Sequence, residues 1–195
     1  MSIVINVISN RSSWIASDGL QRDATTGRVI KEDLQKFEIL NPHLCIGYTG
    51  RYEHARKVVD CLKAECPDIE CATSILAAQY TKAIVDEAVR QLDRLDETFD
   101  AQFVVTGALE NHQIASYTIK QDQKIEEFSC APGEYKYIIL NQKCLGNLEK
   151  MILRRSHHNC GTENAILAGI RDLIRDTARY DNSVNTHMAS HRIDV

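Results

Sequence analysis

The sequence predicts an α+β fold, arranged as a four-layer αββα sandwich in which two mainly antiparallel sheets lie between helix pairs. The first observation behind this prediction is the order of the elements, which runs as strands, two helices, strands and two helices. Segregated blocks of this kind favour layered antiparallel sheets over an alternating βαβ fold. The second observation is size. A chain of 195 residues suffices for one domain with a full core, so we expect a single domain over 1–195.

The first block contains four predicted strands. Apolar, β-branched runs at 3–8 and 14–17 flank a polar turn, which is typical of a hairpin. The polar stretch 18–33 then predicts a loop or irregular edge structure. Two more strands, 36–40 and 43–49, are separated by an Asn-Pro pair, which is a turn signal.

Helical periodicity follows the first strands. A stripe with the spacing i, i+3, i+4, i+7 predicts a helix that ends before Pro67, and its inward residues are Ala55, Val58, Val59 and Leu62. A longer helix is predicted from about 72 to 95, with an inward stripe of Ile84, Ala88, Leu92 and Leu95.

The second half repeats the strand-then-helix order. Strands are predicted at 101–108, 113–120 and 124–130, and 134–140 is expected to continue their sheet. A helix is then predicted to carry Leu145, Leu148, Met151 and Ile152. The last helix is expected to begin near Thr162, with Glu163 in its first turn, and to face inward with Ile166, Ile170, Leu173 and Ile174. A short strand within 185–195 ends the chain.

Composition narrows the class of protein. The hydrophobic share of 44%, the charged share of 26% and the net charge of −4 describe a soluble chain without electrostatic attraction for nucleic acid or anionic membranes. No apolar run reaches the roughly 18 residues of a membrane helix, and the N-terminus lacks the features of a secretory signal. Seven cysteines without a CxxC pair suggest reduced thiols, so we expect a cytoplasmic protein.

Ser2 is the first candidate for chemistry. A small residue after the initiator methionine is the usual substrate for methionine removal, so we expect the mature chain to start at Ser2. A free α-amine has a pKa of about 7.7–8 and can take the proton of the serine hydroxyl. This interpretation requires that nothing precede Ser2, since an extension would turn the amine into an amide. The structural alternative is an ordinary Met-Ser terminus with no role.

Asp18, Lys36 and Gly50 stand at the ends of predicted strands. Together with Ser2 they resemble the proteasome-type N-terminal nucleophile hydrolases, above all the β-type subunits and the peptidase of the bacterial two-component ATP-dependent protease. In that family an aspartate follows the nucleophile by sixteen residues, as Asp18 follows Ser2, and a lysine precedes a glycine by fourteen, as Lys36 precedes Gly50. Each of these residues alone is also compatible with a surface ion pair or a turn.

The resemblance implies a role for each residue. Ser2 Oγ would attack a carbonyl carbon while the Ser2 amine accepts and returns the proton. Lys36 would favour the free amine by its positive charge, and Asp18 would hold the Lys36 ammonium. Gly50 would offer its backbone N–H to the developing oxyanion.

The sequence departs from the family pattern at three places. The family commonly begins with threonine, and this chain has serine. A Gly-Ser-Gly segment precedes the third helix in the family, and here Asn141 stands in its place. A late aspartate is followed three residues on by serine in the family, whereas Asp181 is followed by Ser183 two residues on and by Val184 three residues on. We nevertheless include Asp181 and Ser183 among the candidate catalytic residues.

The resemblance implies a peptidase that cleaves polypeptides inside a homo-oligomeric ring, supplied by a separate ATPase unfoldase because the chain has no nucleotide motif. It implies neither cofactor nor metal. Two alternatives stay open: a small-molecule amidase of the same fold, and a catalytically silent ring scaffold. The histidines and cysteine that could suggest a metal site lack a carboxylate partner and a helical context; they are His157, His158, Cys160, His187 and His191.

Overall fold

The computed structural model describes residues 2–23, 25–66, 68–121, 123–140 and 163–195, and within them two large antiparallel sheets face each other. The four-stranded sheet has the order β10-β1-β2-β11, formed by β1 (Val4–Ile8), β2 (Ser12–Asp18), β10 (Lys136–Leu140) and β11 (Met188–Asp194). The five-stranded sheet runs β5-β6-β7-β8-β9, formed by β5 (Phe37–Asn41), β6 (Leu44–Gly50), β7 (Ala101–Ala108), β8 (Ile114–Ile119) and β9 (Glu126–Ser129).

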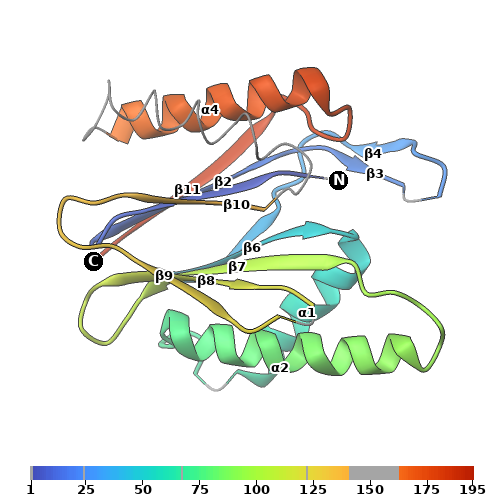
Figure 1. Ribbon diagram of the computed structural model, residues 1–195, viewed down its shortest axis with the longest axis horizontal. Coiled ribbons are helices and arrows are strands. Elements are labelled where there is room, and N and C mark those ends of the chain that lie inside the picture. Colours follow the sequence, from blue (N-terminus) through green and yellow to red (C-terminus); the bar gives the residue numbers. More distant parts are fainter. Residues whose placement is uncertain (1, 24, 67, 122, 141–162) are drawn as a thin grey trace.

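Helices cover the outer face of each sheet (Figure 1). The helices α1 (Tyr52–Glu65) and α2 (Ser74–Asp93) pack on the five-stranded sheet, and α4 (Glu163–Tyr180) packs on the four-stranded sheet. The predicted mixed α/β architecture with antiparallel sheets is therefore confirmed. The helix predicted around 145–152 lies outside the described residues, so the second helix pair stays a prediction. No described helix has the length and apolar character needed to span a membrane.

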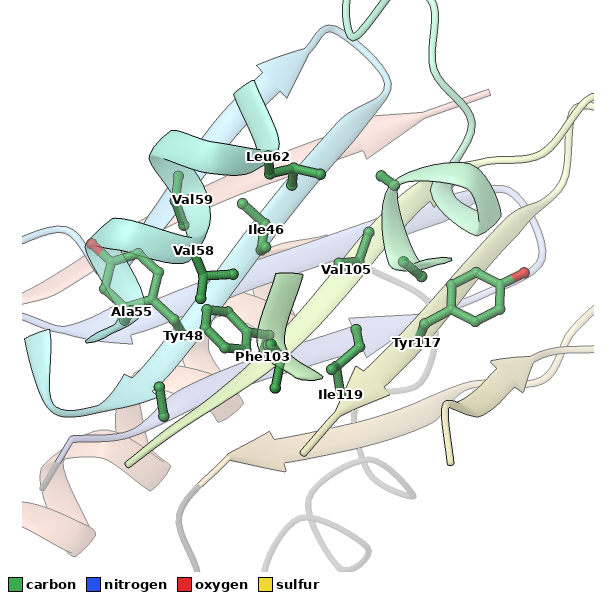
Figure 2. Packing of buried hydrophobic residues seen from close by; sticks show 14 of the residues in the cluster. Ile46, Tyr48, Ala55, Val58, Val59, Leu62, Phe103, Val105, Tyr117 and Ile119 are labelled. Atoms are coloured by element: carbon green, nitrogen blue, oxygen red, sulfur yellow. The ribbon is translucent and has the colours of Figure 1, made fainter. Parts of the chain in front are cut away.

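In the core between the five-stranded sheet and the helices α1 and α2, the inward-facing residues of α1 are as predicted and those of α2 are not (Figure 2). All four residues predicted to face inward from α1 are buried there against Ile46, Tyr48 and Phe103. The buried stripe of α2 is instead Ala77, Ala78, Thr81, Val85 and Val89. The predicted stripe lies beside it: three of its members are only partly buried, and Leu95 lies beyond the helix and is 68% exposed. The buried stripe consists of small and β-branched side chains, which let a helix pack closely on a sheet.

Two strand predictions also need correction. The segment predicted to continue the second sheet is β10, which pairs with β1 in the first sheet and so covers an edge that would otherwise be unpaired. The stretch 18–33, expected to be a loop or irregular edge structure, contains a small irregular hairpin of β3 (Gln21–Arg22) and β4 (Val29–Lys31) rather than a loop throughout. Its turn is closed by Asp23, whose carboxylate accepts hydrogen bonds from the backbone of Thr25 and Thr26, and by Gly27 at φ +69°.

The layer between the two sheets is mostly apolar, with side chains such as Val4, Ile15, Phe37 and Val104 from both sheets in contact. Gly47 of β6 lies at this interface. A Cβ at position 47 would lie 2.7 Å from Ile15 Cδ1 and 2.9 Å from Val4 Cγ1. The absence of a side chain there lets the two sheets approach.

We expect Gly47→Ala to lower the free energy of unfolding by about 1–3 kcal/mol, because the added methyl overpacks the layer between the sheets. The matched control is Gly169→Ala in α4, where nothing lies within 4 Å of the new Cβ. The control should raise the free energy of unfolding by about 0.5–1 kcal/mol through its helix propensity. Urea denaturation measures both, and equal effects of the two substitutions would contradict the prediction.

Candidate active site

The carboxylate of Asp18 lies at the end of β2 and is completely buried. Its Oδ1 atom accepts a hydrogen bond of 2.7 Å from Lys36 Nζ and another of 2.9 Å from the backbone N–H of Ile3. Its Oδ2 atom accepts a hydrogen bond of 3.1 Å from the backbone N–H of Leu20. One carboxylate oxygen therefore joins the lysine ammonium to the peptide that follows Ser2.

Lys36 is held at both its backbone and its side chain. It lies just before β5 and is only 4% exposed. Its backbone N–H donates to Ser17 Oγ at 3.1 Å, and its carbonyl accepts from the N–H of Tyr48 at 3.0 Å. Burial lowers the pKa of Lys36 below its usual value of 10.5, and the neighbouring Asp18 carboxylate opposes that shift. The lysine is thus fixed between strands β2 and β6 of the two sheets.

Ser2 is 6% exposed, and only Ile3 separates it from Val4, the first residue of β1. The backbone of Ile3 contacts Asp18 twice, because its N–H donates to the carboxylate and its carbonyl accepts from the Asp18 N–H at 3.3 Å. Rigid attachment of Ile3 leaves Ser2 one peptide unit from the oxygen that also holds Lys36. The sequence-predicted trio of Ser2, Asp18 and Lys36 is therefore brought into one place.

Gly50 ends β6, and its φ of +99° is one that residues with a Cβ rarely adopt. A Cβ at this position would lie 2.6 Å from the carbonyl oxygen of Asp100. The next residue, Arg51, donates its N–H to that same carbonyl at 2.7 Å and leads into α1. Since Gly50 lies two residues after Tyr48 on β6, it is at the end of the strand that contacts Lys36.

The loop after α4 brings a further segment to this region. Both the N–H, at 2.8 Å, and the hydroxyl of Ser183 donate to Asp181 Oδ1, so these two candidates form a local pair. Val184 is 4% exposed and packs with the core beneath α4. The hydrogen bonds of the Ser183 side chain and N–H therefore run to Asp181 within this loop.

Asn185 is the residue of this loop that sequence reasoning missed. Its Oδ1 accepts the N–H of Gly19 at 2.9 Å, directly beside Asp18, and its Nδ2 donates to the carbonyl of Glu32 at 2.7 Å. Asn185 lies 166 residues from Gly19 in sequence, so no local pattern could have indicated the contact.

The other candidates do not join this site. Asn141, His157, His158 and Cys160 lie outside the described residues. His187 contacts the carbonyl of Glu32, and His191 lies within β11, where a spacing of four residues separates side chains by about 13 Å. Among the described residues no three potential metal ligands gather at one point.

Comparison with known proteins supports the fold. No protein-family model matches the sequence, and no curated protein matches it significantly. The structure resembles Anbu, an ancestral β-subunit, from Yersinia bercovieri, with a TM-score of 0.77, 14% identity, and coverage of 98% of this chain and 81% of that one. It also resembles Anbu from Pseudomonas aeruginosa, solved as a helical assembly, with a TM-score of 0.72, 13% identity, and coverage of 98% and 81%.

A eukaryotic HslV from Trypanosoma brucei is similar over the full length of both chains, with a TM-score of 0.65, 14% identity, and 99% coverage of each. The chain therefore has a proteasome-type N-terminal nucleophile hydrolase-like fold, as the resemblance in sequence predicted. At this level of identity the likeness shows the fold alone, and the chemistry has to be argued from the residues.

We expect Lys36→Met to lower the free energy of unfolding by about 3–5 kcal/mol, because it leaves the buried Asp18 carboxylate without its counter-charge. The double variant Asp18→Asn/Lys36→Met should be more stable than Lys36→Met alone, since no unpaired charge remains. Chemical denaturation of the wild type, both single variants and the double variant measures this coupling. Additive losses would show that the two groups do not act as a pair.

The same pair predicts a pH dependence. Because burial lowers the pKa of Lys36, the unfolded chain holds that proton more tightly than the folded chain. The cost of the buried ammonium is fully present below the lowered pKa and is relieved as the pH rises toward 10.5. The free energy of unfolding of the wild type, minus that of the double variant, should therefore increase over this range. A flat or falling difference would contradict the assignment.

Proposed function

We propose that this chain, which has a proteasome-type N-terminal nucleophile hydrolase-like fold, cleaves peptide bonds through an acyl-enzyme on Ser2 after removal of Met1. The observation that carries the proposal is the shared Asp18 Oδ1 atom, which binds both the Lys36 ammonium and the N–H of Ile3, next to Ser2. An ion pair that is buried and attached to the first strand is costly to maintain for stability alone. A role in activating the N-terminal residue gives a reason for it.

In the proposed reaction the Ser2 amine takes the hydroxyl proton as Oγ attacks the carbonyl carbon of the substrate. The Lys36 ammonium keeps that amine unprotonated by its positive charge, and Asp18 keeps the ammonium in place. The N–H of Gly50 stabilises the oxyanion. The C–N bond then breaks as the protonated Ser2 amine gives this proton to the leaving amine. In the second step the Ser2 amine takes a proton from a water molecule, the resulting hydroxide attacks the ester carbonyl, the C–Oγ bond breaks to release the carboxylic acid, and Ser2 Oγ regains the proton.

We further propose that the chain acts in the cytoplasm on polypeptides, as a homo-oligomer that encloses its sites and receives substrate from a separate ATPase. The complete fold would be the four-layer αββα sandwich with a helix pair on each side. Support for assembly comes from the Anbu structure solved as a helical assembly. A head-to-tail interface builds a closed ring when the rotation between neighbouring subunits returns to the first subunit, and a helical filament when it does not. One type of interface can therefore give either assembly.

One observation favours a second candidate, a catalytically silent scaffold. Val184 is built into the core under α4, and the nearby Ser183 hydroxyl is engaged by Asp181. No serine hydroxyl stands three residues after Asp181, where the resemblance expects one.

The first test measures the mass of the intact protein and the reactivity of Ser2. Protein from its native host should lack the mass of one methionine, and an electrophilic acyl-trap reagent should label Ser2. Ser2→Ala should abolish the label, whereas the matched control Ser190→Ala on the exposed face of β11 should keep it. An uncleaved N-terminal tag should also abolish it, because it converts the amine to an amide.

The outcomes separate the candidates. Retained Met1, or labelling that survives Ser2→Ala, would overturn the Ser2 mechanism. A processed but unlabelled terminus would favour the silent scaffold. Cleavage of small amides without cleavage of peptides would identify an amidase.

Native mass spectrometry over a range of protein concentrations tests the assembly. A closed ring should give one fixed multiple of 22.0 kDa, whereas a helical assembly should grow with concentration. A monomer at all concentrations would rule out an enclosed site.

A further inference from the structure

Four buried polar side chains meet in the middle of the otherwise apolar layer between the two sheets. Asn6 of β1 and Ser13 of β2 come from the four-stranded sheet, and Thr106 of β7 and Ser116 of β8 come from the five-stranded sheet. Each is at most 1% exposed. They lie among apolar residues of both sheets, including Val4, Ile15, Val104 and Ile114 in neighbouring strand positions.

The four side chains form a closed ring of hydrogen bonds, which we call the inter-sheet ring. Asn6 Nδ2 donates to Ser13 Oγ at 2.7 Å, and Ser13 Oγ lies 2.8 Å from Thr106 Oγ1. Thr106 Oγ1 lies 2.6 Å from Ser116 Oγ, which lies 2.8 Å from Asn6 Oδ1. Two of the four bonds, Ser13–Thr106 and Ser116–Asn6, cross from one sheet to the other.

The Asn6 amide fixes the direction of two of the four bonds. The orientation of the Asn6 amide is set by its Nδ2, which also donates to the carbonyl of Trp14 at 3.2 Å. Asn6 Oδ1 can only accept, so Ser116 must donate to it. Ser116 Oγ is also placed as the donor to Thr106 Oγ1, so its single hydroxyl proton is shared between these two acceptors, and in the Ser13–Thr106 pair either hydroxyl can donate. Each of the four side chains is therefore in hydrogen-bond contact with two others of the ring.

Such a ring constrains the sheets in a way that apolar packing does not. Apolar contacts depend little on direction, and a small slide of one sheet over the other would keep most of them. The same slide would break both cross-sheet bonds and leave buried donors and acceptors without partners, which is costly in a low-dielectric interior.

The ring also connects the strands that carry the proposed reacting groups. Asn6 lies four residues after Ser2 in the segment that forms β1. Thr106 lies on β7, which pairs with β6 along its length, so that Ala101 is opposite Gly50. The nucleophile therefore belongs to one sheet and the oxyanion N–H to the other, and the distance between them depends on the offset of the two sheets.

We propose that the inter-sheet ring sets this offset, and that Asn6 and Thr106 are positioning residues for the reaction of Ser2. The proposal rests on the proposed function for its kinetic consequence, while the ring itself can be tested without any activity. Replacement of one ring hydroxyl should misplace Gly50 relative to Ser2 and slow acylation, without changing how substrate binds elsewhere.

The kinetic test compares two substitutions of Thr106. Thr106→Val keeps the shape of the side chain and removes the ring hydroxyl, whereas Thr106→Ser keeps the hydroxyl and removes a methyl. We expect Thr106→Val to lower kcat about tenfold or more with KM within about twofold of the wild type, and Thr106→Ser to keep kcat within about threefold. Equal kcat values for the two variants would overturn the positioning role.

The stability test uses Ser13→Ala and Ser116→Ala, which remove the same atom from two ring members that do not contact each other. Each should lower Tm by about 4–10 °C, because buried groups lose their partners. The double variant should lower Tm by clearly less than the sum, because the first substitution has already opened the ring. A shift equal to the sum would overturn the inter-sheet ring as a cooperative unit.

The two tests separate the failure of this proposal from the failure of the proposed function. If the wild type shows no acylation of Ser2, the proposed function fails, and the Tm cycle still decides on the ring. If the wild type is active and Thr106→Val matches Thr106→Ser, the proposed function stands and the positioning role fails.

Discussion

The structure depends first on the buried carboxylate of Asp18, which is bound by three donors, two of them fifteen and eighteen residues away in the sequence. Lys36 Nζ and the N–H of Ile3 reach one of its oxygens, and the N–H of Leu20 reaches the other. A buried charge without such partners would be strongly destabilising, so each donor stabilises the folded state. The same contacts fix the residue after Ser2 and bring Lys36 beside it, which means that stability and the geometry of the candidate site have a common origin.

The layer between the sheets shows how the two halves of that site are held together. Gly47 allows the sheets to come close, and the apolar side chains around it supply most of the contact. The inter-sheet ring adds direction to this contact, because its hydrogen bonds tolerate only one offset. In this arrangement apolar packing stabilises the contact between the two sheets, and the buried polar groups fix their relative position.

The comparisons place the chain at a distance from proteins of known structure. Identities of 13–14% accompany coverage of 98–99% of this chain, so the backbone arrangement is shared while most side chains differ. The loop after α4 illustrates the consequence. In this chain Val184 belongs to a core, and Asn185 binds the backbone beside Asp18.

The sequence by itself determined the elements whose patterns are local. Periodicity and turn residues were enough to predict the apolar stripe of α1 and the strands β5 to β8. The spacing of the four candidate residues is read directly from the sequence; they are Ser2, Asp18, Lys36 and Gly50. Only the tertiary structure decided the partner of β10, the buried stripe of α2, the contact of Asn185 with Gly19 and the inter-sheet ring. Each of these depends on which surfaces meet in the folded chain, and no local pattern encodes a choice between equally apolar or equally polar partners.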